Sequence, residues 1–261
     1  MPQTIHCIRH AQGYHNLSIA NHTLHDPLLT PYGEEQCRDL ALHFPSHPDA
    51  IIASPIKRTM YTALLTFASD LSANKNLHVI ALPELQETSD LPCDTGSAVE
   101  DLQSEFAGKP VDLSLVKAGW NSKRMKWAPT QPAIEARARE ARVWLANRPE
   151  KEIAVVTHGG FLHYLTEDWS DSHKFQGTGW ANTEFRSYTL DLTTPENPRL
   201  VETPESRRRR RGQEHAYDRE EQAQLKRTST REWEKLGYVN GSGMTAGEAT
   251  GVEGGEIRAK V

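Results

Sequence analysis

The chain has 261 residues, of which 37% are hydrophobic and 25% charged, and its formal net charge is −5 at pH 7. This length suits one large domain or two small ones, and the negative charge argues against a protein built mainly to bind nucleic acid. No apolar run approaches the ~18 residues of a membrane-spanning helix, so no membrane partner is expected. The first residues are typical of a short strand rather than a signal peptide, and three cysteines are too few and uneven for a disulfide framework. We therefore expect a reducing compartment such as the cytoplasm.

Short apolar runs alternate with amphipathic stretches over the first two hundred residues. In chain order we expect a strand at 4–8, a helix at 32–44, a strand at 50–53, a helix at 56–71, a strand at 78–82, a helix at 133–147, a strand at 153–157 and an alternating strand at 186–192. The short runs of Ile, Val, Leu and Ala are typical of strands that are covered on both faces. The pattern therefore predicts an α/β fold, with a mostly parallel central sheet and helices on both faces.

The composition of the chain changes after Pro204. Residues 203–261 hold 12 Lys and Arg against 10 Asp and Glu, whereas the preceding residues hold 18 against 25. We therefore predict a folded domain at 1–203 and a charged tail at 204–261. Alternating charges indicate a solvated helix in this tail to about residue 236. Residues 241–261 have little apolar surface to bury and are expected to be disordered.

Two features of the tail have more than one interpretation. Trp233, Leu236 and Tyr238, its few large apolar side chains, either belong to an appendage, which we favour, or dock a helix back on the domain. The five consecutive arginines 207–211 are typical of a nuclear-import or nucleic-acid-binding signal, or of a basic patch that the following glutamates neutralise. We favour the neutralised patch, with cytoplasmic localisation expected and nuclear localisation as the alternative.

Two histidines fall directly after expected strands. His10 follows the first strand, and His158 follows the strand at 153–157. In open α/β sheets ligands bind outside the carboxyl ends of the strands, so these side chains can converge on one ligand although they lie 148 positions apart. A single histidine at such a place would be explained by a hydrogen bond to backbone. Two of them, each with its own flanking motif, predict a functional site.

Five motifs in a fixed order connect this arrangement with a known family. They are Arg9-His10-Ala11 with Asn16, Leu29-Thr30-Pro31-Tyr32-Gly33, Ser54-Pro55-Ile56-Lys57-Arg58-Thr59 with Thr62-Ala63, Leu85-Gln86-Glu87, and Val156-Thr157-His158-Gly159-Gly160. Over about residues 4–192 the chain resembles the histidine phosphatase (phosphoglycerate mutase-like) superfamily. The stretch from Thr88 to Gly96 resembles the family's small, broad-specificity phosphatases. The resemblance implies a three-layer α/β sandwich.

The resemblance also implies a reaction. The chain would be a metal-independent phosphomonoesterase without a cofactor, acting on a small phosphorylated substrate through a phosphohistidine intermediate. His10 would attack phosphorus, which splits one hard step into two easier ones. Glu87 would protonate the leaving alkoxide and then deprotonate the water that hydrolyses the intermediate.

The negative charge of a phosphomonoester must be neutralised before an imidazole can attack it. Arg9 and Arg58 can each bind phosphate oxygens in a bidentate way that lysine cannot, and His158 would add a third donor. The remaining residues expected to contact the substrate are Asn16, Ala11 and Gly159.

Several alternatives remain open at this stage. Ala11 stands where the family has glycine; its methyl group crowds a phosphate only slightly, so we expect activity to survive. A repurposed module that binds a phospho-ligand without hydrolysing it is the alternative. Glu84, three residues before Glu87, is the alternative acid. A phosphoglycerate mutase-like phosphoryl transferase is the alternative to a phosphatase, which the stretch after Glu87 favours.

A metal centre is a competing explanation for the twelve histidines. His6, Cys7 and His10 lie close together in the sequence, as do His22 and His25. However, no Cys-x-x-Cys pair and no His-x-x-x-His on an expected helix accompany them, so we predict no metal site. The Gly-x-Ser-x-Gly motif of serine hydrolases and the glycine-rich phosphate loop that ends in Gly-Lys-Ser/Thr are also absent.

The segment 108–132 is expected to cover the pocket. It carries several lysines and an arginine together with Trp120 and Trp127. Such a mixture either holds a second anionic group or a ring of the substrate, or forms an ordinary surface excursion.

Overall fold

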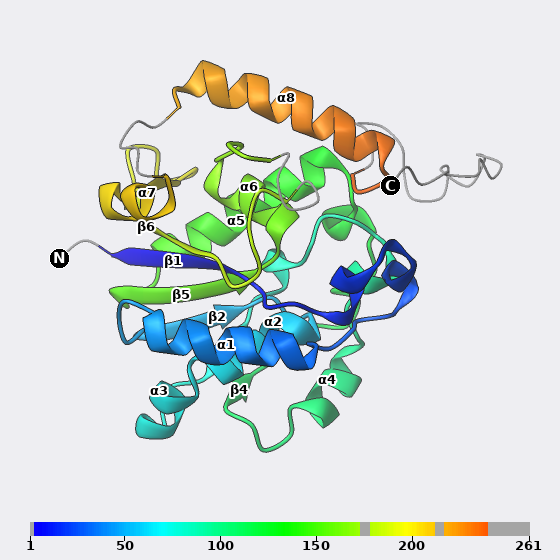
Figure 1. Ribbon diagram of the computed structural model, residues 1–261, viewed down its shortest axis with the longest axis vertical. Coiled ribbons are helices and arrows are strands. Elements are labelled where there is room, and N and C mark those ends of the chain that lie inside the picture. Colours follow the sequence, from blue (N-terminus) through cyan, green and yellow to red (C-terminus); the bar gives the residue numbers. More distant parts are fainter. Residues whose placement is uncertain (1–2, 173–177, 212–216, 240–261) are drawn as a thin grey trace.

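The centre of the fold is one sheet, with its strands in the order β4-β3-β2-β5-β1-β6-β7 (Figure 1). The computed structural model describes residues 3–172, 178–211 and 217–239, and these strands lie within those ranges. The bounds are β1 Thr4–Arg9, β2 Ala50–Ala53, β3 Val79–Ala81, β4 Val111–Asp112, β5 Glu152–Thr157, β6 Phe185–Asp191 and β7 Arg199–Glu202. β4, β3, β2, β5 and β1 pair in parallel, while β6 and β7 are antiparallel to their neighbours. The predicted mostly parallel α/β fold is confirmed.

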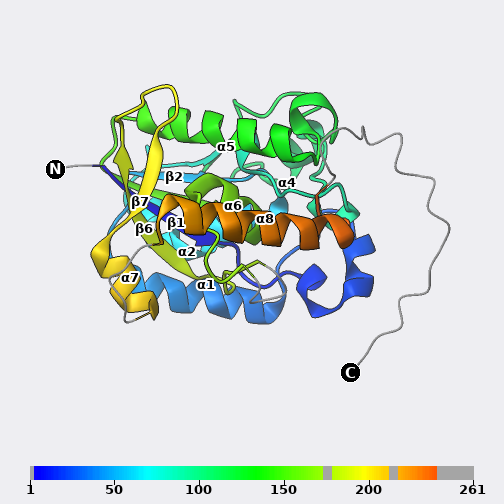
Figure 2. The ribbon, with the colours of Figure 1, turned by 90° about the horizontal axis from the view of Figure 1, so that it is seen from above.

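Helices cover both faces of this sheet (Figures 1 and 2). α1 and α2 lie on one face, and α5 and α6 lie on the other. The helix bounds are α1 Pro31–His43, α2 Lys57–Thr66, α3 Ala68–Ala73, α4 Val99–Glu105, α5 Gln131–Ala146, α6 Gly159–Thr166, α7 Pro204–Arg211 and α8 Arg219–Lys235. Short 3-10 helices at 14–17, 19–23, 83–85, 92–94 and 125–127 lie in the connections.

The strands supply side chains alternately to two hydrophobic cores. In β5, Ile153 and Val155 face the core under α5 and α6, whereas Ala154 and Val156 face the core under α1 and α2. Successive side chains of a strand point to opposite faces, so a strand buried on both faces must be apolar at every position. This explains the continuous apolar runs in the sequence.

The differences from the predicted elements have local causes. The helix expected at 56–71 is two helices, because the backbone of Phe67 leaves the helical region between α2 and α3. β4 has only two residues and α6 begins with Gly159 and Gly160, which are poor helix formers. α6 is buried along its whole length, so packing rather than propensity stabilises it.

The tail helix α8 packs on the domain instead of standing apart from it. Trp233 is 4% exposed and its ring contacts the rings of Trp169 and Tyr164, while Leu236 is 64% exposed. The structure therefore favours the alternative in which α8 docks on the domain. Trp233 makes this contact, and Leu236 does not. The boundary at residue 203 stays a prediction, and the expected disorder of 241–261 falls outside the described residues.

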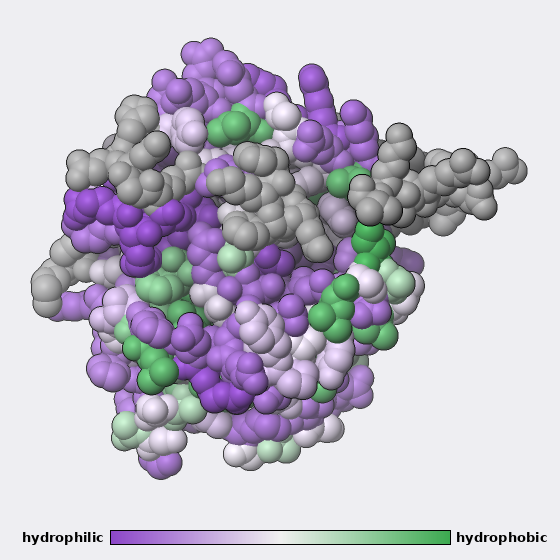
Figure 3. All heavy atoms as spheres, viewed as in Figure 1, coloured by the Kyte–Doolittle hydropathy of each residue, from purple (hydrophilic) through white to green (hydrophobic). Residues whose placement is uncertain are grey.

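The arginine run forms most of α7, and its described partners lie mainly in the domain. Arg210 pairs with Glu202 at 2.6 Å and with Asp168 at 3.3 Å, and the guanidinium of Arg209 lies 3.9 Å from the ring centre of Phe185. These partners precede the run, whereas we expected the glutamates that follow it. The surface of α7 and α8 is nevertheless mostly hydrophilic (Figure 3).

Two further observations concern the class of protein. All three cysteines are buried free thiols. In the ranges that the structure describes, none of the helices has the length and apolar character needed to cross a bilayer.

Candidate active site

The two strand-end histidines lie side by side. β1 and β5 are adjacent and parallel, with Arg9 opposite Thr157, so the residues that follow both strands leave the sheet at the same edge. The ring centres of His10 and His158 are 5.3 Å apart. The sheet topology therefore brings His10 and His158 together, as the sequence analysis predicted.

His10 is held as a neutral imidazole. Its Nδ1 lies 2.7 Å from the carbonyl oxygen of Ala11, which can only accept, so Nδ1 carries the proton and Nε2 keeps its lone pair. His10 is 2% exposed, and burial together with the nearby Arg58 and Arg9 lowers its pKa well below the ordinary value. A buried, neutral imidazole with its lone pair on Nε2 is the form that can act as a nucleophile.

Arg58 connects the two histidines. It lies in the first turn of α2, and its side chain is 1% exposed. Its Nε donates to His10 Nε2 at 3.2 Å, and its Nη2 donates to His158 Nδ1 at 3.1 Å and to Asp94 Oδ1 at 2.9 Å. Its Nη1 donates to the carbonyl oxygen of Cys93 at 2.5 Å. The guanidinium is therefore fixed beside the nucleophilic nitrogen.

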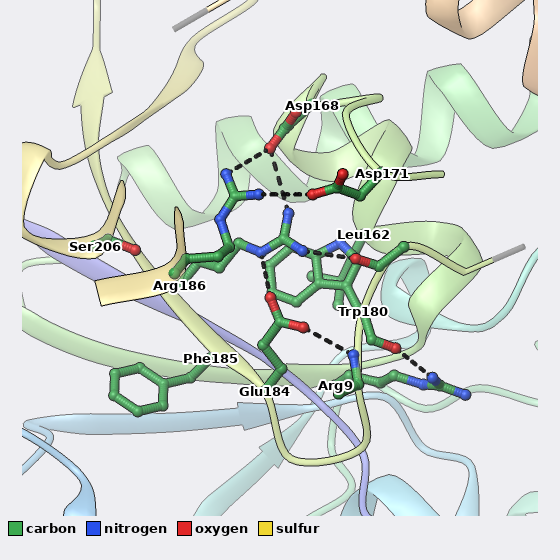
Figure 4. Close-up of polar contacts among 12 residues, drawn as sticks. Arg9, Leu162, Asp168, Asp171, Trp180, Glu184, Phe185, Arg186 and Ser206 are labelled. Carbon is green, nitrogen blue, oxygen red and sulfur yellow. Dashed lines mark hydrogen bonds and ion pairs between the residues drawn. The ribbon is translucent and has the colours of Figure 1, made fainter. Parts of the chain in front are cut away.

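Arg9 approaches the same space from the end of β1. Its Nη1 donates to Thr178 Oγ1 at 3.0 Å and to the carbonyl oxygen of Trp180 at 2.5 Å (Figure 4). Behind this contact, Arg186 lies 3.6 Å from the ring centre of Trp180 and pairs with Glu184 at 2.8 Å. Burial lowers the pKa of Arg9 to about 10, so it stays charged at neutral pH. Its buried Nε has no hydrogen-bond partner among the described residues.

Glu87 follows the 3-10 helix at 83–85, and its carboxylate lies at the N-terminus of α6. Its carboxylate oxygens accept backbone N–H groups from Thr88 at 2.9 Å, Phe161 at 2.9 Å and Gly160 at 3.2 Å. A Cβ at Gly160 would lie 2.7 Å from Glu87 Oε1, which explains why glycine stands there. Burial, and after it the charge of Asp94, raises the pKa of Glu87, although the backbone donors and Arg58 oppose this shift. Its neutral, protonated form is therefore favoured more than in an exposed glutamate.

Glu84 and Glu87 are separated by the structure. Glu87 lines the cavity described below, whereas Glu84 does not and its Oε1 accepts from Lys126 Nζ at 2.6 Å. The short 3-10 helix at 83–85 turns the two side chains apart. Of the two acids considered, only Glu87 has the position needed to reach a substrate.

The cavity between these groups is lined by sixteen residues from distant parts of the chain: Arg9, His10, His15, Asn16, His22, Arg58, Glu87, Thr88, Ser89, Leu91, Cys93, Asp94, Gly160, Thr178, Trp233 and Tyr238. Asn16 Oδ1 accepts from the backbone N–H of Gly13 at 3.0 Å, which leaves its amide nitrogen to donate. The predicted His10, Arg9, Arg58, Glu87 and Asn16 therefore come together at one cavity.

Three predicted residues lie next to this cavity and do not line it. His158 is behind Arg58, with Nδ1 accepting from Arg58 and Nε2 2.9 Å from Ser54 Oγ. The Ala11 amide donates to Thr62 Oγ1 at 3.0 Å, and Ala11 packs with Leu29 and Cys37. Gly159 lies against Thr178, which a Cβ would approach to 2.5 Å. These three residues therefore do not line the cavity, and their expected contact with the substrate stays a prediction.

Eleven of the sixteen cavity residues were not among the predicted site residues, and two of them, His15 and Asp94, lie against His10 and Arg58. His15 is 7% exposed, lies 5.3 Å from His10 between ring centres, and its Nδ1 has no partner among the described residues. Asp94 pairs with Arg58, and its Oδ2 accepts from Ser89 Oγ at 2.5 Å. Their only sequence signals are short separations, His15 directly before Asn16 and Asp94 seven residues after Glu87.

The segment 108–132 does not form the expected lid, since none of its residues lines the cavity. β4 adds part of it to the sheet edge, and Trp120 is buried against Gly96. Lys123 comes nearest the site, with Nζ 3.5 Å from the carbonyl oxygen of Glu87. Burial lowers its pKa to about 7.

The residues considered as metal ligands do not form one cluster. His6 contacts Ser187 and Glu152 and does not line the cavity, while Cys7 is buried in the core under α5 and α6. Within residues 3–172, 178–211 and 217–239 no three His, Cys, Asp or Glu side chains are grouped so as to hold a metal ion.

Comparisons with known proteins bear on the family of this chain. The sequence model of the histidine phosphatase superfamily (branch 1) matches residues 5–203. A phosphoglycerate mutase-like protein of Arabidopsis thaliana is 31% identical over 232 residues, 72% of this chain and 81% of the relative. A probable phosphatase of Schizosaccharomyces pombe is 29% identical over 161 residues, 60% of this chain and 74% of the relative. A phosphoserine phosphatase structure from Entamoeba histolytica aligns with 76% of this chain and 95% of its own, with 19% identity and a TM-score of 0.47.

Proposed function

Because the chain belongs to the histidine phosphatase superfamily (branch 1), we propose that it is a phosphatase that hydrolyses a small phosphomonoester, without a metal ion, through a phosphohistidine on His10. One observation carries the proposal. The hydrogen bond from His10 Nδ1 to the Ala11 carbonyl leaves the lone pair on Nε2, which accepts from Arg58 Nε, and His10 lines one cavity together with the buried Arg9 and Arg58. An anion that enters this cavity meets the nucleophile and two positive charges at once.

Substrate binding follows from the charges of the site. Arg9 and Arg58 are buried cations, and within the described residues only Arg58 has a carboxylate partner within salt-bridge distance, Asp94. A phosphate dianion supplies the missing charge and can accept from both guanidinium groups. The Nε of Arg58, which donates to His10 Nε2 in this structure, then donates to a phosphate oxygen and frees the lone pair. Asn16 adds a neutral donor through its amide nitrogen.

The first chemical step forms the bond between His10 Nε2 and phosphorus and breaks the bond from phosphorus to the alcohol oxygen. The proton on Glu87, which the raised pKa favours, moves to the departing alkoxide. His158 acts indirectly, since it accepts from Arg58 and so fixes the orientation of that guanidinium. Positioning and charge neutralisation supply most of the catalysis in such a transfer.

The second step returns the enzyme to its starting state. Ionised Glu87 takes a proton from water as the water oxygen attacks phosphorus, and the bond to His10 Nε2 breaks. Inorganic phosphate leaves, and Glu87 is protonated again. His10 is neutral before and after each cycle, consistent with its lowered pKa.

The test is hydrolysis of para-nitrophenyl phosphate with and without a chelator. Equal release of phosphate in both conditions supports a metal-independent phosphatase, whereas loss of activity in the chelator contradicts it. Binding of phosphate without any turnover would favour a phospho-ligand binding module. Transfer of the phosphoryl group between the hydroxyls of a phosphoglycerate, in preference to water, would favour the mutase-like alternative that the name of the Arabidopsis relative suggests.

A further inference from the structure

The cavity has two ends of different chemistry. Arg9, Arg58 and Glu87 belong to the end where the phosphoryl group binds under the proposed function. The rest of the wall includes three rings, those of His22, Trp233 and Tyr238, together with Leu91 and several small polar side chains. This second part of the wall, the outer end, therefore presents rings and small polar side chains, and its one carboxylate among the described residues, Asp94, pairs with Arg58.

The outer end is built by segments from opposite ends of the chain. His22 comes from the 3-10 helix at 19–23, and Tyr238 follows α8; their ring centres lie 6.5 Å apart. Gly237 has a φ of 74°, a left-handed conformation that suits glycine after a helix, and it turns the chain so that Tyr238 N donates to the Trp233 carbonyl at 2.9 Å. Because Trp233 is anchored in the core, the position of Tyr238 at the cavity is fixed as well.

The charges of the wall exclude some substrates. Among the described residues of the cavity wall, the only lysine or arginine side chains are Arg9 and Arg58. A second carboxylate or phosphate on the alcohol part of a substrate would find no guanidinium or ammonium partner at the outer end, and desolvating an unpaired charge is costly. The cavity itself has a volume of about 90 Å³, so a substrate ring larger than the phosphoryl group would extend toward the open mouth.

Resting on the proposed function, we propose that this outer end is the leaving-group subsite and that it selects phosphomonoesters whose alcohol carries an uncharged planar ring. Aromatic rings favour offset or edge-to-face contact with other rings, and such pairs add affinity beyond the area they bury. The ring of the substrate would lie against Tyr238 and His22, with the edge of Trp233 at the base. Contacts between the substrate ring and the outer end stabilise the transition state when they hold the phosphoryl group beside His10. Such contacts are measured as an increase in kcat/KM.

The test compares three alkyl phosphates whose leaving alcohols have similar reactivity: benzyl phosphate, cyclohexylmethyl phosphate and ethyl phosphate. We expect kcat/KM for benzyl phosphate to exceed that for cyclohexylmethyl phosphate by about 3- to 10-fold, the size of one or two aromatic pairs. Equal values for the two rings would overturn the proposed subsite while leaving the phosphatase intact. Hydrolysis of none of the three would instead contradict the proposed function itself.

Variants of Tyr238 identify the residues responsible. Tyr238→Phe keeps the ring and should keep the preference for benzyl over cyclohexylmethyl phosphate, whereas Tyr238→Leu should reduce this ratio toward one. Leu236→Ala, at an exposed position two residues away that does not line the cavity, is the matched control and should change neither value. The subsite would be contradicted if the ratio of kcat/KM for benzyl over cyclohexylmethyl phosphate persisted in both Tyr238→Leu and His22→Ala. It would also be contradicted if kcat/KM for 3-phosphoglycerate exceeded that for benzyl phosphate.

Discussion

The two ends of the cavity are built in different ways. The phosphate end comes from the ends of β1 and β5 and the starts of α2 and α6, so sheet register and helix packing determine where Arg9, His10 and Arg58 lie. The outer end comes from a 3-10 helix and from the residues after α8, which approach from outside the sheet. The comparison suggests that the reaction depends on the first end and the choice of substrate on the second.

Removing the nucleophile is the most severe test of the phosphate end. We expect His10→Ala to lower kcat by about 10³-fold or more, because the variant lacks the Nε2 that forms the bond to phosphorus. Thermal unfolding checks that the fold persists. His78→Ala, at an exposed histidine away from the cavity, is the matched control and should retain activity. Full turnover in His10→Ala would refute a phosphohistidine at this position.

Glu87→Gln should separate substrates by their leaving groups. A lost general acid costs about 10²- to 10⁴-fold with alkyl phosphates, whose alkoxides need the proton, and much less with aryl phosphates. Since the pKa of Glu87 is raised, the wild-type kcat/KM for an alkyl phosphate should fall as pH rises through that pKa, and Glu87→Gln should lose this dependence. Glu84→Gln is the control. The same loss on both classes of substrate would argue for a structural role of Glu87.

Trp233→Ala tests whether the outer end depends on the docked tail. Truncating a buried tryptophan costs about 3–5 kcal/mol of the free energy of unfolding, which lowers Tm by roughly 10 °C in a domain of this size. Scanning calorimetry measures the shift, with Leu236→Ala as the exposed control from the same segment. An unchanged Tm would mean that α8 is an appendage after all.

Arg58→Lys measures what the guanidinium contributes beyond its charge. The variant keeps the positive charge and loses the planar set of donors that reaches His10, His158 and Asp94 together. The loss of transition-state stabilisation should be about 2–3 kcal/mol, or roughly 30- to 150-fold in kcat/KM. Arg38→Lys, on the exposed face of α1, is the control. Activity within a factor of two of wild type would show that charge alone is sufficient.

Acid should lower the free energy of unfolding, because three histidines at the phosphate end have lowered pKa values. Burial first, and nearby positive charges second, lower the pKa values of His10, His15 and His158, so the unfolded chain binds protons that the folded chain does not. The free energy of unfolding should therefore fall as pH drops below about 6.5, by about 1.4 kcal/mol per pH unit for each histidine. In urea titrations at several pH values, His15→Gln should reduce the dependence of the unfolding free energy on pH by the share of one histidine. An unchanged slope in His15→Gln would contradict the lowered pKa of His15.

Much of the phosphate end could be predicted from the sequence because its signals are local. The apolar runs of β1 and β5 predict the two strands, and parallel strands end at the same edge of the sheet. Each histidine follows its strand, so both are predicted to lie at that edge. The resemblance to the family, now confirmed, added Arg58 and Glu87 as candidates, which no periodicity would have selected. Their roles stay predictions.

The outer end could not be predicted in the same way, since its contacts join residues about two hundred positions apart. Nothing near His22 in the sequence indicates that Tyr238 lies beside it, and the charged composition of α8 suggested a solvated helix. The inward residues Leu225, Ser229 and Trp233 recur at four-residue spacing, but the two large apolar ones, Leu225 and Trp233, are separated by a serine and are too few to indicate a buried face. The predicted lid at 108–132 was wrong because its tryptophan fills the core beside Gly96 instead.

The most direct test of the central claim is a rapid-quench experiment with an aryl phosphate carrying radiolabelled phosphorus. The account predicts a burst of the phenol close to one equivalent of enzyme wherever hydrolysis of the intermediate limits turnover. It also predicts protein-bound label that is stable in alkali, labile in acid and confined to the peptide containing His10. Label on another residue, or turnover without any protein-bound phosphate under conditions that trap phosphohistidine, would contradict it.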